Sequence, residues 1–279
     1  MIKLFHVSDI HFGVEDPMAH GWFKDCVARE KPDGIALTGD LTQRATLGQF
    51  AAATRWIASL EAPVKVEIGN HDMPYYDPVE RAFAPYRRFL TLQNAVERSI
   101  DLPGVSLVSL RSTSRAQWRT NWSRGIIRPA ALSETLAAIA AVPKGDMVIV
   151  CTHHPLVETN TKGEVLTRHG ENALCELAKA GVHAILTGHV HDAFDLTHPT
   201  PHGPIRMIGA GTLSRRVRST PPSFNELTIE DGTITVCARN VAELETAAVQ
   251  IDDIPPNAEP PQPGDRVAPA APLVEDRST

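Results

Sequence analysis

The chain of 279 residues has few aromatic residues, no excess of basic residues and no long apolar run. Without an apolar run of about 18 residues, a membrane-spanning helix is not expected. The 27 basic residues are outnumbered by 33 acidic ones, and the net charge of -6 gives no general attraction for nucleic acid or an anionic membrane. The amino terminus enters a strand pattern directly, without the features of a signal peptide, so we expect a cytoplasmic protein.

The four cysteines are widely separated and form no C-x-x-C pair, which favours free buried thiols over disulfides. Cys151 adjoins a histidine cluster, where a thiolate nucleophile or a soft metal ligand has to be considered. It ends the apolar run Val148-Ile149-Val150, however, and this position favours a role in the core.

Strand-like and helical patterns alternate along the chain before residue 205. Such alternation is typical of parallel strands joined by crossover helices. The segment 73–88, with three prolines and several aromatic residues, interrupts it. The expected strands are 3–7, 35–38, 64–68, 105–110, 147–151 and 183–186, and the expected helices are 18–29, 47–60, 130–140 and 171–180.

From Ile205 onward the pattern changes to that of antiparallel strands, expected at 205–208, 225–229 and 233–238. The turn Asp231-Gly232 joins the last two, and we expect these strands to complete a second sheet through hairpins. Beyond about Asp252 the chain holds seven of its 22 prolines. Residues 251–279 are therefore predicted to form an extended or disordered tail after a single catalytic domain of residues 1–250.

Five short polar clusters each follow one of the expected strands. Because open α/β sheets place their ligands at the carboxyl ends of the strands, we expect the clusters to meet in one site. The clusters are Asp9-Ile10-His11, Gly39-Asp40, Gly69-Asn70-His71-Asp72, Cys151-Thr152-His153-His154-Pro155 and Gly188-His189-Val190-His191.

The side chains in these clusters suit a pair of metal ions. Such ions bind carboxylate oxygens and neutral imidazole nitrogens, and two ions about 3.5–4 Å apart need a bridging carboxylate. Asp40 is the candidate bridge, because it follows the neighbouring strand and can span both ions. Each residue alone could be a cap or turn residue, but the full set favours a metal site. The other candidate ligands are Asp9, His11, Asn70, His153, His189 and His191.

In this order, the clusters resemble the motifs D-x-H, G-D, G-N-H-D, H-x-P and G-H-x-H of the calcineurin-like metallophosphoesterase superfamily. The resemblance covers roughly residues 3–238 and is greatest to the bacterial class III cyclic-nucleotide and glycerophosphodiester phosphodiesterases. It implies an α/β fold in which two mixed sheets form a four-layer α-β-β-α sandwich. It also implies a metal-dependent hydrolase that cleaves a small organic phosphodiester by attack of a metal-bridging hydroxide.

The resemblance also implies a role for each site residue. His71 would stabilise the phosphoryl oxygens or protonate the leaving group, and Asp72 would hold the loop or orient an imidazole. The first metal ion would take Asp9, His11, Asp40 and His191, and the second would take Asp40, Asn70, His153 and His189.

Proteins with other functions can carry the same motifs. A phosphomonoesterase or a broad organophosphate hydrolase would use the same residues, whereas a non-catalytic scaffold of this fold would be expected to lack ligands. The mixture of oxygen and nitrogen ligands admits two ions of Mn²⁺, Fe²⁺/Fe³⁺, Zn²⁺ or Co²⁺. The expected partner is a small phosphate ester, and assembly into a homo-oligomer stays open.

Two basic segments and the segment 73–88 are candidates for substrate recognition. We interpret 73–88 as a loop with one short helix that covers the site. Each basic segment fits an anion-binding rim, and a solvated loop at an oligomer contact explains it as well. The first contains Arg111, Arg115, Arg119, Arg124 and Arg128 with Trp118 and Trp122, and the second contains Arg215, Arg216 and Arg218.

Overall fold

Two five-stranded sheets form the centre of the molecule. In the first sheet, β1 pairs in parallel with β2 and antiparallel with β9. The strand order is β10-β9-β1-β2-β3 in the first sheet and β4-β5-β6-β8-β7 in the second. Both sheets therefore mix parallel and antiparallel strands, as the sequence predicts.

The computed structural model describes residues 1–114, 123–162 and 167–242. The strands in these ranges are β1 (Ile2–Val7), β2 (Gly34–Leu37), β3 (Val64–Val66), β4 (Val105–Ser109), β5 (Met147–Cys151), β6 (Ala184–Thr187), β7 (Phe194–His198), β8 (Ile205–Gly209), β9 (Ser223–Glu230) and β10 (Thr233–Asn240). The helices are α1 (Pro17–Glu30), α2 (Leu47–Ala58), α3 (Pro78–Phe83), α4 (Arg87–Val96), α5 (Pro129–Ala140) and α6 (Gly170–Lys179), with a 3₁₀ helix at Asn70–Asp72.

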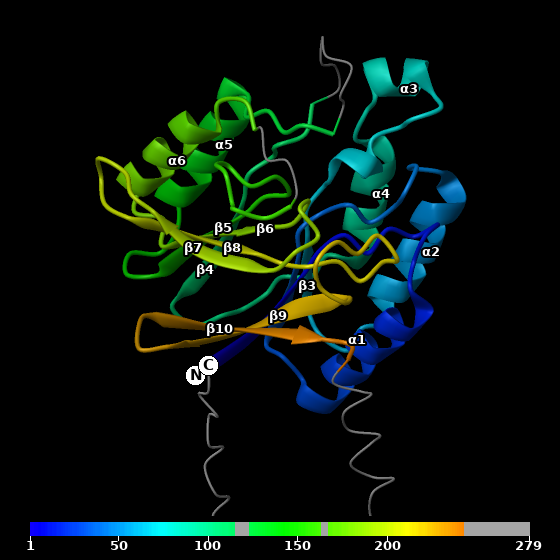
Figure 1. The fold of residues 1–279 in the computed structure, drawn as a ribbon. Coiled ribbons are helices and arrows are strands. Elements are labelled where there is room, and N and C mark those ends of the chain that lie inside the picture. Colours follow the sequence, from blue (N-terminus) through cyan, green and yellow to red (C-terminus); the bar gives the residue numbers. More distant parts are fainter. Residues whose placement is uncertain (115–122, 163–166, 243–279) are drawn as a thin grey trace, which may run out of the picture. The chain divides into compact units, whose positions relative to one another are not determined.

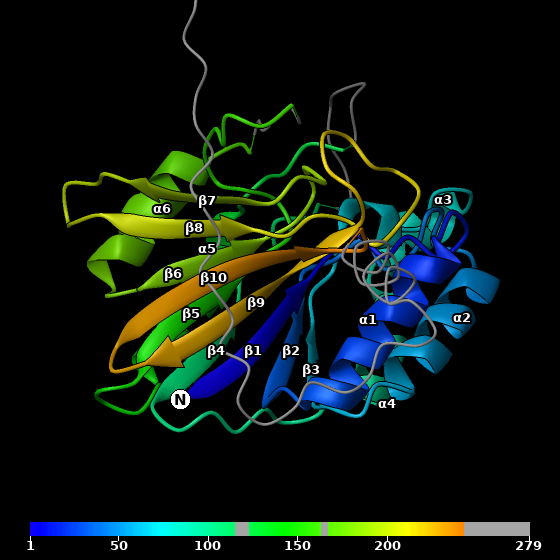
Figure 2. The same cartoon turned by 60° about the horizontal axis from the view of Figure 1, so that its bottom comes forward.

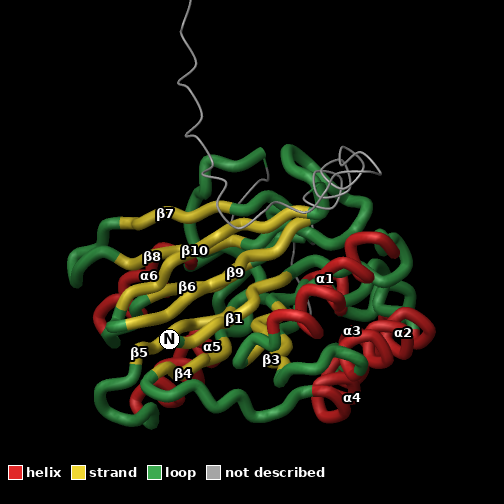
Figure 3. Tube along the Cα trace, turned by 90° about the horizontal axis from the view of Figure 1, so that it is seen from below, coloured by secondary structure: helices red, strands yellow, loops and turns green. Residues whose placement is uncertain are grey.

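Helices cover the outer face of each sheet (Figure 1). Helices α1, α2 and α4 lie against the first sheet, and α5 and α6 lie against the second (Figure 2). A third apolar cluster fills the space between the sheets and joins Leu4 and Leu227 of the first to Ile149 and Ile208 of the second. The strands of both sheets thus lie between two layers of helices (Figure 3), and the predicted four-layer sandwich is confirmed.

Local sequence signals explain where the first two helices begin. The Asp16 carboxylate accepts the backbone N–H groups of Met18 and Ala19 at 3.0 and 3.2 Å, and Pro17 occupies the first helical position of α1. The Thr46 hydroxyl accepts the N–H of Gln49 at the start of α2. Such caps satisfy N–H groups that have no partner within the helix, so both helices start close to their predicted positions.

The prediction for the last strands is wrong in two respects. The hairpin of β9 and β10 belongs to the first sheet, because β9 pairs with β1 from Ile2 opposite Ile229 to His6 opposite Asn225. Strand β8 is parallel to β6, and its antiparallel partner is β7, which the sequence analysis did not identify. Long-range pairing, rather than the local turn, decides which sheet receives a hairpin.

The segment 73–88 contains the one short helix expected there, α3, but a second helix begins before the segment ends. This helix, α4, buries Phe89, Leu92 and Val96 against the first sheet. Their spacing of three and four residues is that of one helical face, so the signal was present in the sequence. The predicted boundary at residue 250 and the predicted tail lie outside the described residues, of which 1–242 form one unit.

Within the described ranges, none of the helices combines the length and the apolar character that crossing a membrane requires.

Candidate functional site

The seven predicted metal ligands lie together at the carboxyl ends of the strands. Asp9 and His11 follow β1, Asp40 follows β2, Asn70 follows β3, His153 follows β5, and His189 and His191 follow β6. Donor atoms of Asp9, His11 and His191 lie within 4.8 Å of one another. The same limit holds for Asp9, Asp40 and His153, and the Asn70 amide oxygen lies 3.2 Å from His153 Nε2.

The Asp40 carboxylate stands between histidines of the two groups. Its Oδ2 atom lies 3.3 Å from His153 Nε2 and 3.8 Å from His11 Nε2. Its Oδ1 atom accepts the backbone N–H of His71 at 2.8 Å. One oxygen is thus fixed by the loop after β3, and the other faces both groups of donors, as a bridging ligand requires.

Backbone carbonyls orient three of the imidazoles. The Nδ1 atoms of His153 and His191 lie 2.8 and 2.6 Å from the carbonyl oxygens of Thr38 and Arg216. His11 Nδ1 lies 3.4 Å from another carbonyl oxygen, that of Thr42. A ring nitrogen beside a carbonyl must donate, so each Nε2 atom is directed at the cluster and is available to a cation.

Asp9 provides the test of whether this cluster fits a cation. Its Oδ2 atom accepts the N–H of His189 at 2.8 Å, and its buried Oδ1 atom lies 3.0 Å from His191 Nε2 and 3.5 Å from His11 Nε2. Burial alone would raise the pKa of Asp9, yet His191 and His11 lower it well below its usual value. Because the Nδ1 atoms of His191 and His11 face carbonyl oxygens, the neutral rings carry no hydrogen on Nε2 and offer Oδ1 no donor. The buried carboxylate therefore needs a positive neighbour, and a metal ion between it and the two Nε2 atoms fits that need.

The pKa of the His153 imidazole also indicates that the cluster attracts positive charge. Burial lowers the pKa of this imidazole, but the Asp40 carboxylate outweighs that effect and raises it to about 9. By contrast, burial and the neighbouring His153 lower the pKa of His189 to about 3. The cluster therefore favours a positive charge beside Asp40 and keeps His189 as a neutral donor, which is the form that a metal ion binds.

Five of the seven predicted ligands adopt left-handed backbone conformations. The φ angles are 56° for Asp9, 42° for His11, 52° for Asp40, 71° for His189 and 61° for His191. Residues other than glycine rarely adopt this region, and such strain concentrates at functional sites. The chain turns sharply at each strand end, which allows Asp9 and His11 to reach one group although they are only two residues apart.

Two glycines of the motifs allow the ligand loops to approach one another. A Cβ atom at Gly188 would overlap the Ser8 hydroxyl and lie 2.6 Å from Asp9 Oδ2, and a Cβ atom at Gly69 would overlap the Oδ1 and backbone nitrogen atoms of Asp40. Both positions would displace a proposed ligand carboxylate. The glycines before His189 and Asn70 are therefore part of the site, although they carry no chemistry.

We expect Gly188→Ala to weaken the affinity for Mn²⁺ by roughly 10–100-fold, because the new methyl group pushes the Asp9 carboxylate out of place. Calorimetric titration of metal-free protein measures this change. Gly48→Ala is the control, since a Cβ atom there has no neighbour within 4 Å. An unchanged affinity in the Gly188 variant would contradict the role given to Asp9.

His71 and Asp72, the predicted catalytic residues, take different positions. His71 Nδ1 lies 2.9 Å from the carbonyl oxygen of Gln43, and its Nε2 lies 2.9 Å from Arg216 Nη1 in the pocket above the cluster. Asp72 is buried and accepts the backbone N–H groups of Gly69 and Leu41 at 2.9 and 3.1 Å. Its contacts are those of a residue that holds the loops after β2 and β3 together.

His154 and Cys151 adjoin the proposed ligands but make structural contacts. Donor atoms of His154 lie within 4.8 Å of those of His153 and His189. His154 Nδ1 lies 2.8 Å from the Ser112 hydroxyl oxygen and its Nε2 lies 3.0 Å from the Ser123 carbonyl oxygen, so both ring nitrogens are engaged. Burial raises the pKa of the Cys151 thiol to about 12, which keeps it protonated. Cys151 therefore belongs to the core, as its apolar run indicates.

The pocket above the cluster has a volume of about 270 Å³ and includes residues that the motifs did not reveal. Arg216 and Arg218 of the second basic segment line it, whereas Arg215 does not. Lys162 lines it too, and nothing in the sequence pattern distinguishes this lysine from others. None of its described lining residues comes from 73–88, so the structure does not support the prediction that this segment covers the site.

The first basic segment does not form a continuous rim in the described residues. Arg111 pairs with Glu134 at 3.5 Å, and Arg128 donates to the Ser114 hydroxyl, whereas Arg124 lines the metal pocket. Arg115, Trp118, Arg119 and Trp122 lie outside the described residues.

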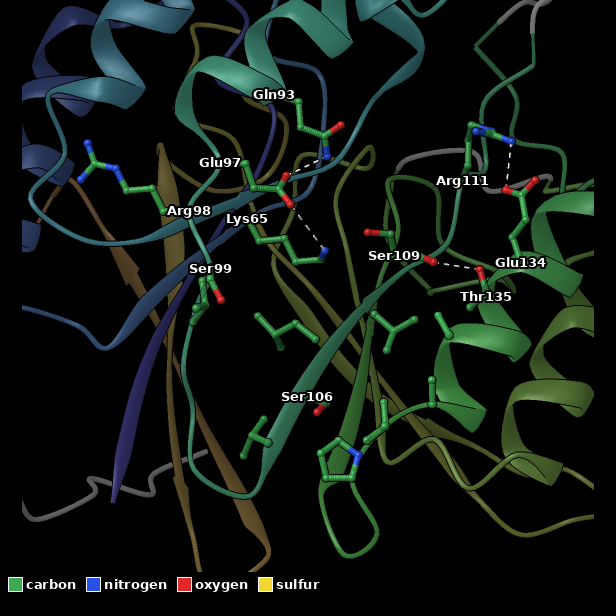
Figure 4. A pocket seen from close by; sticks show the side chains of 18 of the residues that line it. Lys65, Gln93, Glu97, Arg98, Ser99, Ser106, Ser109, Arg111, Glu134 and Thr135 are labelled. Carbon is green, nitrogen blue, oxygen red and sulfur yellow. Dashed lines mark hydrogen bonds and ion pairs between the residues drawn. The ribbon is translucent and has the colours of Figure 1, made fainter.

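A larger cavity, of about 990 Å³, lies between the edge strands β3 and β4 (Figure 4). Four of its five charged lining residues form pairs within the wall: Lys65 Nζ lies 4.0 Å from Glu97 Oε1, and Arg111 contacts Glu134. None of the proposed metal ligands lines it. Its size alone therefore does not make it the active site.

Comparison with known proteins agrees with this geometry. The family model for calcineurin-like phosphoesterases matches residues 2–193. The chain belongs to this family. The 3′,5′-cyclic adenosine monophosphate phosphodiesterase CpdA of Pseudomonas aeruginosa is 24% identical over 266 residues, which cover 91% of each chain.

Two solved structures show the same fold at low identity. A dimetal phosphatase from Danio rerio has a TM-score of 0.64 and 12% identity, over 86% of this chain and 96% of that chain. The purple acid phosphatase PPD1 from yellow lupin seeds has a TM-score of 0.64 and 15% identity, over 87% of this chain and 52% of that chain. Calcineurin-like phosphoesterases are dinuclear metal-dependent enzymes, and this chain is a metal-dependent phosphoric ester hydrolase.

Proposed function

We propose that this calcineurin-like phosphoesterase hydrolyses a small organic phosphodiester with two divalent metal ions. The position of Asp40, with one carboxylate oxygen facing His11 and His153, is the main support for a shared pair of ions. The similarity to CpdA, whose name describes a cyclic AMP phosphodiesterase, supports a diester substrate. The proposed ligands are Asp9, His11, Asp40 and His191 for the first ion, and Asp40, Asn70, His153 and His189 for the second.

When bound, the two ions would supply Lewis-acid charge and a nucleophile at neutral pH. The chain would supply the remaining interactions with substrate. His71 Nε2 and the Arg216 guanidinium lie side by side in the pocket, where both can contact the phosphoryl oxygens. Asp72 would act as a positioning residue, because it ties the loop that carries Asn70 and His71 to the loop that carries Asp40.

A phosphomonoesterase remains the second candidate, since both reactions use the same ligands. A non-catalytic scaffold is not favoured, because the chain has all seven expected donors and backbone carbonyls orient three of the imidazoles. The cytoplasmic location and the metal identity stay predictions from the sequence.

We expect a chelator to lower hydrolysis of bis(4-nitrophenyl) phosphate by at least about 10³-fold, because both groups of ligands lose their cations. Adding Mn²⁺, Co²⁺, Zn²⁺ or Fe²⁺ singly to the metal-free enzyme, with metal content measured in parallel, identifies the ion that restores activity. With that ion, kcat/KM should be at least about tenfold higher for the diester than for 4-nitrophenyl phosphate. The reverse preference would identify a phosphomonoesterase.

A further inference from the structure

The entrance of the metal pocket is strongly basic. Arg124, Lys162, Arg216 and Arg218 line it, and Asp40 is the sole carboxylate among its described lining residues. These basic residues come from three different loops. The Arg218 guanidinium donates to the Lys162 carbonyl oxygen at 3.3 Å, which joins two of these loops at the rim.

Three of the four basic side chains at this entrance lack the acidic partners seen elsewhere in the described parts of the chain. Arg216 Nη1 contacts His71 Nε2 at 2.9 Å, His11 Nε2 at 3.4 Å and the Gln43 side-chain oxygen at 3.4 Å. Within the described ranges, neither Lys162 nor Arg218 forms an ion pair with a carboxylate, and the same is true of Arg216. In the larger cavity, by contrast, Arg111 and Lys65 have glutamate partners.

The charge of the site exceeds what one phosphodiester can balance. Two divalent ions would bring four positive charges, and the proposed ligands include two carboxylates, Asp9 and Asp40. The hydroxide nucleophile and a phosphodiester would contribute one negative charge each and balance the metal site itself, so the three positive charges of Arg216, Arg218 and Lys162 would remain without a counterion. Cations placed together without anions repel one another, and they favour a ligand that carries several negative charges.

We propose that the preferred substrate carries a second phosphate group besides the scissile phosphodiester, and that Arg218 and Lys162 bind this group at the rim. The proposal rests on the phosphodiesterase function proposed above. Arg216, which lies deeper beside His71, would contact the phosphoryl group that reacts. Guanidinium and ammonium groups from two loops suit a phosphate dianion, because its oxygens accept hydrogen bonds from both.

Two substrates with the same leaving group test this proposal in the metal-loaded enzyme. Thymidine 5′-(4-nitrophenyl phosphate) carries one negative charge, and its 3′-phosphorylated derivative carries the additional phosphate. We expect kcat/KM to be at least about tenfold higher for the phosphorylated substrate at low ionic strength, and the ratio should fall as salt is added. The double variant Arg218→Gln/Lys162→Gln should bring this ratio close to one.

Arg215→Gln is the matched control, because this neighbouring arginine is exposed and does not line the pocket. It should keep the wild-type ratio. A second measurement is independent of catalysis: metal-free protein should bind thymidine 3′,5′-bisphosphate more tightly than thymidine 5′-monophosphate, and the double variant should lose this difference.

A wild-type ratio of one or less, with both diesters hydrolysed, would overturn the proposed second phosphate site and leave the phosphodiesterase function intact. If the enzyme cleaves neither diester but cleaves 4-nitrophenyl phosphate, the proposed function fails. In that case the comparison of nucleotide binding still tests whether Arg218 and Lys162 bind a phosphate group, and equal affinities for the two nucleotides would overturn this proposal.

Discussion

Asp40→Ala is expected to lower kcat/KM for a phosphodiester by at least about 10³-fold and to reduce the bound metal from two ions to one or none. The Asp40 carboxylate has one oxygen held by the His71 N–H and the other facing both groups of donors. Without this carboxylate, the two proposed ions would share no protein ligand, and their mutual repulsion would be less well neutralised. Metal binding and activity should therefore be lost together.

Metal analysis of the purified variant, combined with steady-state kinetics, measures both effects. Asp195→Ala is a suitable control, because the Asp195 carboxylate pairs with Arg206 on β7 and β8, away from the cluster. Thermal unfolding of each metal-free variant verifies that the fold persists. A variant that binds two ions and turns over at nearly the wild-type rate would contradict the dinuclear assignment.

His71→Ala is expected to retain both ions and to lower kcat by roughly 10²–10⁴-fold. Metal content should be unchanged, because His71 is not a proposed ligand and its imidazole is held by Gln43 and Arg216. The backbone N–H that His71 donates to Asp40 persists in the alanine variant. His202→Ala, which changes an exposed loop histidine, should leave both metal content and kcat unaltered.

The dependence on the leaving group separates two roles for His71. If its imidazole protonates the leaving oxygen, the loss should be small for 4-nitrophenolate, which needs little protonation, and large for an alkoxide. Equal losses would instead indicate that His71 stabilises the phosphoryl oxygens. The contact between its Nε2 atom and Arg216 is consistent with an Nε2 lone pair in this structure, so protonation would require Arg216 to turn away. Loss of metal from the variant would overturn the assignment of His71 as a non-ligand.

The sequence predicts the location of the site because two simple patterns coincide. Buried strands such as β5 and β6 appear as short apolar runs, and each run ends in donor residues. The rule that parallel strands place ligands at their carboxyl ends then brings His153 and His189 to the same edge as Asp9. The cluster can be expected from these runs and the residues that follow them, whereas the four-layer arrangement of the sheets is expected from the resemblance to the metallophosphoesterase superfamily.

Other features depend on contacts that no local pattern records. The carbonyl groups that orient the imidazoles belong to Thr38, Thr42 and Arg216, and any residue at these positions would offer the same group. In the second basic segment, Arg216 lines the pocket and Arg215 does not. The sequence could not distinguish the two arginines, because an irregular loop has no periodicity from which side-chain direction can be predicted. The sheet that accepts the β9–β10 hairpin is likewise decided by its pairing with β1.

The left-handed conformation of the ligand loops limits how this centre can be re-engineered for another metal. Histidine, aspartate and asparagine tolerate positive φ angles better than other donors, whereas threonine and other β-branched residues do not. Exchange of His189 or His191 for such a donor would cost about 1–3 kcal/mol in backbone strain before any effect on metal affinity. The backbone thus restricts which residue types can serve as ligands at five positions. Asn70 does not have a positive φ angle, so substitution at this position is the better route to a different metal selectivity.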